Sequence, residues 1–221
     1  MTVAPEVDER FMRLALDEAS KGSPSPNPHV GAVIVGVVEG ESRVLGRGFH
    51  RRAGEAHAEV AAIRDAAQRA IAPVEGATMY VTLEPCNHHG RTPPCTEAIL
   101  AAKIARVVVG VRDPNPRVVG RGIARLLAAE VEVTERVLEA ACAAQIAPFA
   151  RHCTSGLPFV RVKIASSLDG RIAAPTLHHP ADAPMPNARA WITGPESRTL
   201  VHAMRAAADA VATGVGTVLE D

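Results

Sequence analysis

Residues suited to metal and proton chemistry lie at the ends of elements that the sequence predicts. His57 and Glu59 open the alanine-rich run "HAEVAAI", Cys86 follows an apolar run, and Cys95 begins another. If the two helix starts lie side by side at the carboxyl edge of a parallel sheet, one imidazole and two thiols meet at one point. Three such ligands leave a fourth tetrahedral position open, which distinguishes a catalytic zinc site from a closed structural one.

Glu59 stands beside this predicted metal site without being one of its ligands. Zinc can lower the pKa of bound water from about 16 to about 7. Glu59 could take that proton and pass it to a leaving group, and helix starts favour the thiolate forms that metal binding needs. The residues therefore predict a hydrolytic site with Glu59 as the catalytic residue and His57, Cys86 and Cys95 as zinc ligands.

Other interpretations of these residues stay open at this point. The same side chains could form a structural zinc site that is closed by a fourth ligand such as His88. Cys142 lies in an alanine-rich helix, where we expect a small buried apolar residue rather than a ligand. Cys153 belongs to no motif, and His89 is expected at the surface.

The elements that must position these residues follow from the apolar patterns. A helix capped by Asp8 precedes two strands, 30–38 and 43–49, joined as a hairpin through Gly40. The pattern then alternates, with helices at 57–70, 95–103, 122–130 and 137–152 and strands at 77–83, 104–111 and 131–135. This order predicts an α/β fold with one mixed, mostly parallel sheet between helices.

Composition narrows the class of protein further. The chain has 221 residues, of which 47% are hydrophobic and only 3% aromatic, so an aliphatic core typical of α/β proteins is expected. Lys plus Arg and Asp plus Glu both total 24, which provides no excess charge for nucleic acid or anionic membranes. No signal peptide or membrane span is recognisable. We expect a cytoplasmic protein with a small-molecule partner.

The chain is expected to contain two domains, 1–150 and 157–221, with a linker at 151–156. In the second, strands are predicted within 159–170 and at 209–214, with a helix at 196–207 between them. The proline-rich stretch 174–190 is expected to be a loop. Because two strands cannot close a sheet with two covered faces, this domain looks incomplete, and its apolar surface predicts a homo-oligomer.

The spacing His-x-Glu, Pro-Cys and a second Cys resembles the zinc-dependent cytidine deaminase superfamily. Eight residues, "NHHGRTPP", separate the two cysteines here. Together with "NPHVGAVIV" (27–35), "GRGFHRRAGEAHAE" (46–59) and "TLEPCNHHGRTPPC" (82–95), this long loop resembles the deaminase domain of the bifunctional riboflavin-biosynthesis deaminase/reductase family over about residues 8–150. The resemblance implies a cytidine-deaminase-like three-layer α/β/α domain.

The second part of the chain resembles the start of the NADPH-dependent reductase domain of the same family. The similar segments are "VKIASSLDGRIA" (162–173) and "WITGPESRTLVHAMRAAADAVATGVGTVLED" (191–221). The resemblance implies the beginning of a dihydrofolate-reductase-like α/β domain. Arg189 departs from the family, which usually has a small hydroxyl residue two positions before the Trp.

The family resemblance implies two reactions and the residues for each. The first removes an amine from 2,5-diamino-6-ribosylamino-4(3H)-pyrimidinone 5′-phosphate, and the second reduces the ribose of the product with NADPH. For the first, the implied substrate-binding residues are Asn27, His50, His88 and Arg91, of which Arg91 could hold the phosphate. For the second, Arg205 would meet the substrate, and the implied NADP contacts are Ala165, Trp191, Thr217 and Asp221.

Because the second domain looks incomplete, we expect this polypeptide to deaminate its substrate but not to reduce the product. Two alternatives remain for the first site. One is a zinc deaminase of other nucleosides or of RNA bases, which the neutral charge disfavours. The other is a zinc-binding interaction module without turnover. The substitution Glu59→Gln distinguishes catalysis from the second alternative. A catalytic site would lose ammonia release but keep its zinc.

Overall fold

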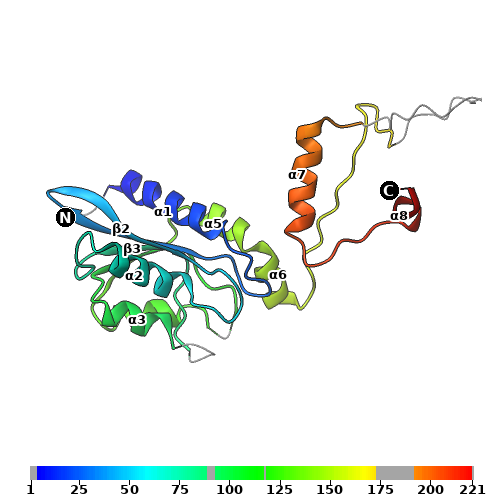
Figure 1. Ribbon diagram of the computed structural model, residues 1–221. Coiled ribbons are helices and arrows are strands. Elements are labelled where there is room, and N and C mark those ends of the chain that lie inside the picture. The colour runs from blue at the N-terminus through cyan, green and yellow to red at the C-terminus, as the bar shows by residue number, and fades with distance from the viewer. Residues whose placement is uncertain (1–3, 89–92, 117, 173–191, 221) are drawn as a thin grey trace, which may run out of the picture. The chain divides into compact units, whose positions relative to one another are not determined.

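The chain divides into two units, Met1–Phe159 (unit 1) and Val160–Asp221 (unit 2), which are described separately. Figure 1 shows the computed structural model, which describes residues 4–88, 93–116, 118–172 and 192–220. The domain boundaries predicted from the sequence stay a prediction.

Unit 1 is built on a five-stranded sheet in the order β2-β1-β3-β4-β5. The strands are β1 (Gly31–Val38), β2 (Glu41–Phe49), β3 (Thr78–Leu83), β4 (Arg106–Val111) and β5 (Glu132–Thr134). The pairs β3–β4 and β4–β5 are parallel, whereas β1 pairs antiparallel with both β2 and β3. The mixed sheet is confirmed, but it is not mostly parallel, because the hairpin adds two antiparallel pairings.

The hairpin between β1 and β2 closes through two residues, Glu39 and Gly40, both with positive φ (54° and 83°). Two-residue hairpin turns with positive φ match the twist of the strands, and glycine adopts this conformation without strain. The turn predicted at Gly40 is therefore confirmed.

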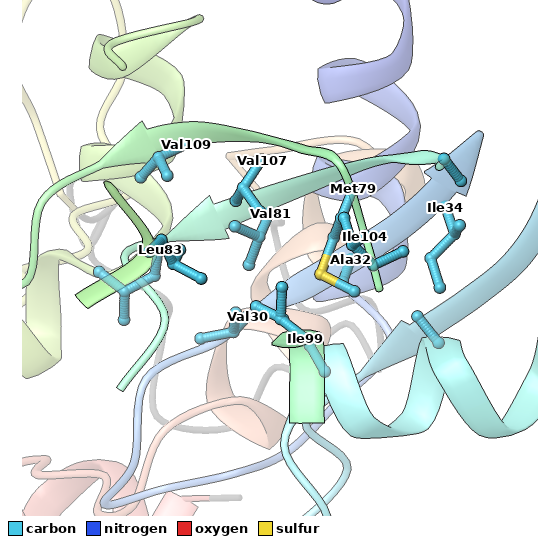
Figure 2. Packing of buried hydrophobic residues seen from close by; sticks show 14 of the residues in the cluster. Val30, Ala32, Ile34, Met79, Val81, Leu83, Ile99, Ile104, Val107 and Val109 are labelled. Carbon is cyan, nitrogen blue, oxygen red and sulfur yellow. The ribbon is translucent and has the colours of Figure 1, made fainter. Parts of the chain in front are cut away.

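Helices cover both faces of the sheet. One face packs against α2 (Ala58–Arg69), α3 (Cys95–Ala101) and α4 (Arg121–Leu127) through the cluster drawn in Figure 2. The other face packs against α1 (Pro5–Ala19) and α5 (Glu139–Gln145). Ala32 and Ile34 belong to the first cluster and Val33 and Val35 to the second, as the alternation of a strand requires. The predicted three-layer α/β/α architecture is confirmed.

The sequence suggested that Asp8 caps the first helix, and this prediction is wrong. The N-cap is Ala4, and Pro5 occupies the first turn, where a missing N–H costs nothing. Asp8 lies inside α1 and is buried, where it accepts two hydrogen bonds from the Arg106 guanidinium at 2.9 and 2.8 Å and one from the Tyr80 hydroxyl at 2.9 Å. The carboxylate ties α1 to the sheet instead.

The helix predicted over 137–152 is two helices. α5 ends at Gln145, and α6 (Ala147–Ser155) follows a break at Ile146. Pro148 at the start of α6 lacks the N–H that a continuous helix would need. Residues 151–155 of the predicted linker belong to α6. Cys142 in α5 is fully buried, as expected of an apolar residue.

Unit 2 contains α7 (Pro195–Ala206) and α8 (Val215–Glu220). The strands predicted within 159–170 and at 209–214 are wrong, since neither segment is a strand. An extended segment becomes a strand only when another lies beside it to exchange backbone hydrogen bonds, and the described residues of this unit provide no such pair. The loop predicted at 174–190 lies outside the described residues.

Among the residues that the structure describes, no helix combines the length and the apolar character that a membrane crossing would require.

Candidate metal centre

His57, Cys86 and Cys95 come together at one end of the sheet of unit 1. Their ligand atoms all lie within 4.8 Å of one another, and the His57 Nδ1 is 3.5 Å from the Cys86 Sγ and 3.3 Å from the Cys95 Sγ. A tetrahedral zinc ion with Zn–S near 2.3 Å and Zn–N near 2.0 Å requires N···S separations of about 3.5 Å. The donor set and its spacing therefore fit zinc, with three protein ligands and room for a fourth.

Two glycines of β2 bring the helix that carries His57 close to the sheet. A Cβ at Gly46 or Gly48 would collide with the backbone of α2, at Ala62 in both cases and also at Ala58 for Gly48. The helix therefore lies directly on the strand backbone. His57 is its N-cap, so the imidazole is fixed by the contact between α2 and β2.

The second and third ligands are joined by the backbone at the start of α3. Cys95 is the first residue of α3, after the N-cap Pro94, and its backbone N–H donates to the Cys86 Sγ at 3.4 Å. The backbone N–H of Thr96 donates to the Cys86 carbonyl at 3.2 Å. These two hydrogen bonds hold Cys86 beside the start of α3, so the two sulfur atoms lie close together.

The three ligand side chains also shift one another's protonation. Hydrogen bonds from Cys95 and His57 lower the pKa of Cys86, which favours its thiolate, the form that binds metals. The hydrogen bond to Cys86 and burial raise the pKa of Cys95, and the hydrogen bond to Cys86 raises the pKa of His57.

Glu59 lies in the first turn of α2, two residues after the ligand His57. Its side chain is 3% exposed, and burial raises the pKa of its carboxyl group to about 7. A group with this pKa exchanges a proton readily at neutral pH, as a general acid and base must.

The ligands open into a cavity of about 530 Å³. Of the residues predicted to act in the first reaction, those that line this cavity are Asn27, His50, His57, Glu59, Cys86 and His88. Cys95 is buried beneath it, with 1% of its surface exposed. Arg91 lies outside the described residues. His88 is exposed at the cavity edge and is not one of the clustered ligand residues, so nothing in the described site supports the closed structural zinc site.

His50 and Asn27 form an ordered pair in the cavity wall. The His50 Nδ1 lies 3.1 Å from the Ala56 carbonyl, which can only accept, so the proton is on Nδ1. The Nε2 atom then accepts from the Asn27 amide nitrogen at 2.9 Å. Burial lowers the pKa of His50, which favours this neutral form. The pair fixes which end of the Asn27 amide faces His50.

Four further residues of the cavity were not predicted from the sequence. Glu84, Asp113, Asn115 and Val118 also line it. A signal was available, because Asp113 and Asn115 follow β4 at the carboxyl edge of the parallel strands, where sites of open α/β sheets form.

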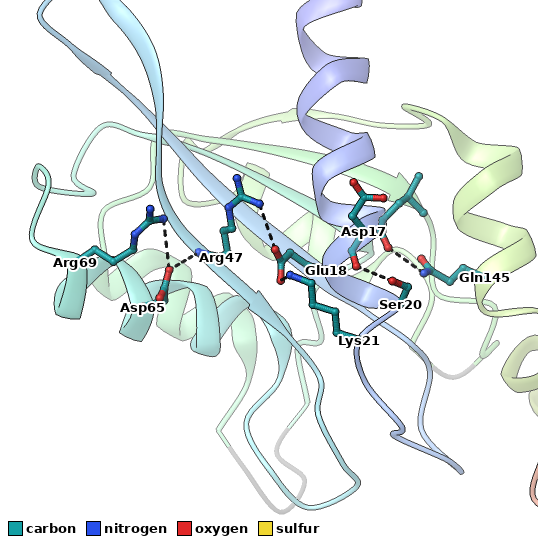
Figure 3. Close-up of polar contacts among 9 residues, drawn as sticks. Asp17, Glu18, Ser20, Lys21, Arg47, Asp65, Arg69 and Gln145 are labelled. Carbon is teal, nitrogen blue, oxygen red and sulfur yellow. Dashed lines mark hydrogen bonds and ion pairs between the residues drawn. The ribbon is translucent and has the colours of Figure 1, made fainter. Parts of the chain in front are cut away.

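A second cavity, of about 570 Å³, is lined by none of the three ligands. The buried Glu18 carboxylate at its border accepts from Lys21 at 2.7 Å and from Arg47 at 3.4 Å, as Figure 3 shows. Asp65 accepts the Arg47 backbone N–H at 2.8 Å and lies 3.8 Å from Arg69. These contacts connect α1, β2 and α2.

The predicted reductase residues lie in separate segments of unit 2. Ala165 is half-buried in an irregular segment, Arg205 is exposed on α7, and Thr217 belongs to α8. Trp191 and Asp221 lie outside the described residues. The described part of unit 2 therefore brings no NADP site together.

Comparison with known proteins matches both units. Residues 5–111 match the family model of the cytidine and deoxycytidylate deaminase zinc-binding region, and residues 158–221 match that of the RibD C-terminal domain. The chain is 43% identical to the riboflavin biosynthesis protein RibD of Escherichia coli over 216 residues. The aligned region covers 97% of this chain and 54% of that protein. The relative from Aquifex aeolicus is 43% identical over 218 residues, with coverages of 98% and 56%.

Solved structures give the same result. A Thermotoga maritima diaminohydroxyphosphoribosylaminopyrimidine deaminase/5-amino-6-(5-phosphoribosylamino)uracil reductase superposes with a TM-score of 0.83 at 42% identity, covering 98% of this chain and 58% of that one. Acinetobacter baumannii RibD, form 1, gives a TM-score of 0.79 at 42% identity, with coverages of 99% and 57%. The chain spans about half the length of the curated relatives it matches.

Proposed function

We propose a function from the premise that the chain belongs to the RibD family of riboflavin-biosynthesis proteins. Unit 1 hydrolyses 2,5-diamino-6-ribosylamino-4(3H)-pyrimidinone 5′-phosphate, replacing one amino group by a carbonyl oxygen and releasing ammonia. The observation that carries this proposal is the convergence of His57, Cys86 and Cys95 beside the buried Glu59 in one cavity.

In this proposal the three clustered residues hold zinc, and Glu59 transfers the proton. When bound, zinc supplies a nucleophile at neutral pH by lowering the pKa of water. A carboxylate oxygen of Glu59 takes the proton from the attacking water and delivers it to the departing amino nitrogen. Its pKa near 7 suits both halves of this transfer, and its place in the first turn of α2 keeps it next to His57.

The cavity wall binds the substrate. Asn27, oriented by His50, offers amide groups to the edge of the base. His88 at the cavity edge and Arg91 in the neighbouring loop meet the phosphate, for which Arg is well suited. A small-molecule substrate rather than nucleic acid, self-association into homo-oligomers and a cytoplasmic location are parts of the same proposal.

For unit 2 we propose the family's NADPH contacts at Ala165, Trp191, Thr217 and Asp221, with Arg205 toward the substrate. Because Ala165, Arg205 and Thr217 lie on separate segments of unit 2, we expect this polypeptide to deaminate and not to reduce.

The proposal is tested by ammonia release from the diaminopyrimidinone phosphate, with metal analysis of the same samples. Glu59→Gln should keep zinc bound and slow ammonia release by about 10²- to 10⁴-fold, because the amide cannot transfer the proton. Glu75→Gln is the control, since Glu75 is exposed and pairs only with Lys103 on the surface among the described contacts. Unchanged release by Glu59→Gln, or no release by the parent protein, would refute the proposal.

A further inference from the structure

Glu84 is a buried carboxylate that the proposed reaction does not use. It follows β3 directly and is 4% exposed. Its Oε2 accepts the backbone N–H groups of Asp113 at 3.2 Å and Gly120 at 2.9 Å. Its Oε1 accepts those of Gly122 at 2.9 Å and Ile123 at 3.3 Å. Four backbone donors from one segment therefore converge on a single side chain.

The segment that Glu84 holds forms one wall of the cavity. Asp113, Asn115 and Val118 line the cavity that also contains Asn27 and the metal ligands His57 and Cys86. The Asp113 carboxylate also accepts the Asn115 backbone N–H at 2.8 Å, which shapes the turn after β4. Without Glu84, the donors at both ends of this segment would lose their acceptor, and a buried N–H without a partner is costly.

The same residue is two positions from a metal ligand. Glu84 donates its own backbone N–H to the Val111 carbonyl at 2.9 Å, and Cys86 follows after Pro85. A Cβ at Gly122 would collide with the Pro85 carbonyl, so the start of α4 packs directly against the segment that carries Cys86. The wall and the metal ligand are thus fixed to one short piece of backbone.

We propose that Glu84 is a positioning residue, which sets the distance between the Asp113–Val118 wall and the metal centre and thereby determines which substrates fit. The Asp113 carboxylate on that wall accepts hydrogen bonds from O–H or N–H donors of the ligand, such as sugar hydroxyls. This inference rests on the proposed function for the identity of the ligand, but the restraint itself is a property of the fold.

A carboxylate is required because each oxygen accepts two N–H groups. Glutamine has a single acceptor oxygen, so two of the four backbone N–H groups would lose their acceptor. The amide nitrogen of glutamine would instead place its own N–H donors against those two groups. Glu84→Gln therefore preserves the size of the side chain and removes half of the restraint.

The test compares Glu84→Gln with Glu18→Gln. Glu18 is a matched control, because it is also a buried carboxylate (3% exposed) but lines the second cavity and not the cavity of the metal centre. Amide hydrogen exchange, zinc content, and KM and kcat for ammonia release are measured for both. We expect Glu84→Gln to speed exchange of the four backbone amides that Glu84 binds between residues 113 and 123 at least tenfold, to retain zinc, and to raise KM about tenfold or more with a smaller change in kcat.

The control should leave exchange in residues 113–123 and KM at their parent values, even if it lowers the melting temperature. The inference is overturned if Glu84→Gln leaves that exchange and KM unchanged, or if Glu18→Gln alters both to the same extent. Hydrogen exchange reports the restraint without substrate, so a parent protein that releases no ammonia refutes the proposed reaction while the restraint is still measured.

Discussion

Unit 1 and unit 2 differ in how their side chains are enclosed. In unit 1, helices cover both faces of a five-stranded sheet, and residues from three distant parts of the sequence meet at one point. In unit 2, no residue between 160 and 220 whose exposure the structure describes is buried, and apolar side chains such as Val162, Ile164 and Leu168 face outward. Both units nevertheless match family models, residues 5–111 that of the cytidine and deoxycytidylate deaminase zinc-binding region and residues 158–221 that of the RibD C-terminal domain.

The difference shows what a motif needs in order to become a site. His57 and Cys95 lie at the starts of α2 and α3, and Cys86 follows β3, so their ligand atoms converge. In the described part of unit 2, the family residues lie on segments that are not packed into layers. A domain requires at least two packed layers around a core. Each unit matches a family model, but among the described residues only those of unit 1 bring predicted site residues together.

The largest effect expected from this comparison is that of removing the metal. Treatment with a chelator should reduce ammonia release to background and lower the melting temperature of unit 1, because a metal bound only by the folded state stabilises it. Adding zinc back at one equivalent should restore both. Full activity in demonstrably metal-free protein would show that the chemistry of unit 1 does not depend on its three clustered ligands.

A smaller effect is expected from the buried ion pair that ties α1 to the sheet. Asp8→Ala leaves the Arg106 guanidinium buried without its main partner and should lower the free energy of unfolding of unit 1 by about 3–5 kcal/mol. Urea denaturation followed by circular dichroism measures this change. Arg13→Ala on the same helix is the control, since its pair with Glu9 is exposed and its loss should cost at most about 0.5 kcal/mol.

The equivalent change in unit 2 sharpens the comparison. Asp169 and Arg171 form an exposed pair, with both side chains about two-thirds accessible. Asp169→Ala should leave the denaturation curve unchanged, because solvent screens the pair and no core depends on it. A shift as large as that of Asp8→Ala would mean that unit 2 contains a cooperative core.

The smallest signal is expected in the reductase assay. With the deaminated product as substrate, this polypeptide should oxidise NADPH no faster than buffer, because Ala165, Arg205 and Thr217 lie on separate segments of unit 2. The Thermotoga maritima deaminase/reductase provides the positive control. NADPH consumption that depends on both the protein and the product would contradict the distinction between the two units.

Much of unit 1 could be predicted from the sequence because local patterns determine it. Period-two and helical spacing located every strand of unit 1 to within a few residues, and the types and spacing of His57, Glu59, Cys86 and Cys95 indicated the zinc chemistry. The role of Asp8 could not be predicted, because an acid near a helix start suggests a cap, whereas its partners Arg106 and Tyr80 are distant in sequence.

The missed features share one physical cause, which is dependence on long-range contacts. Glu84 is an unremarkable acid in "TLEPC" until the fold brings four backbone N–H groups to it. Likewise, the segments near 160 and 210 have strand-like composition, but a strand forms only beside a partner. Residue type limits the contacts that a side chain or segment can make, and its neighbours in the fold determine which of them form.

The start of α2 carries both His57 and Glu59, within a single helical turn. A rigid shift of this helix would change the geometry of the metal ligand and the reach of the proton carrier at the same time. Adapting the pocket to a different leaving group by moving this helix would therefore disturb both functions together. Substitutions at Asp113 and Asn115, which line the same cavity but follow β4, would change the pocket without moving this helix.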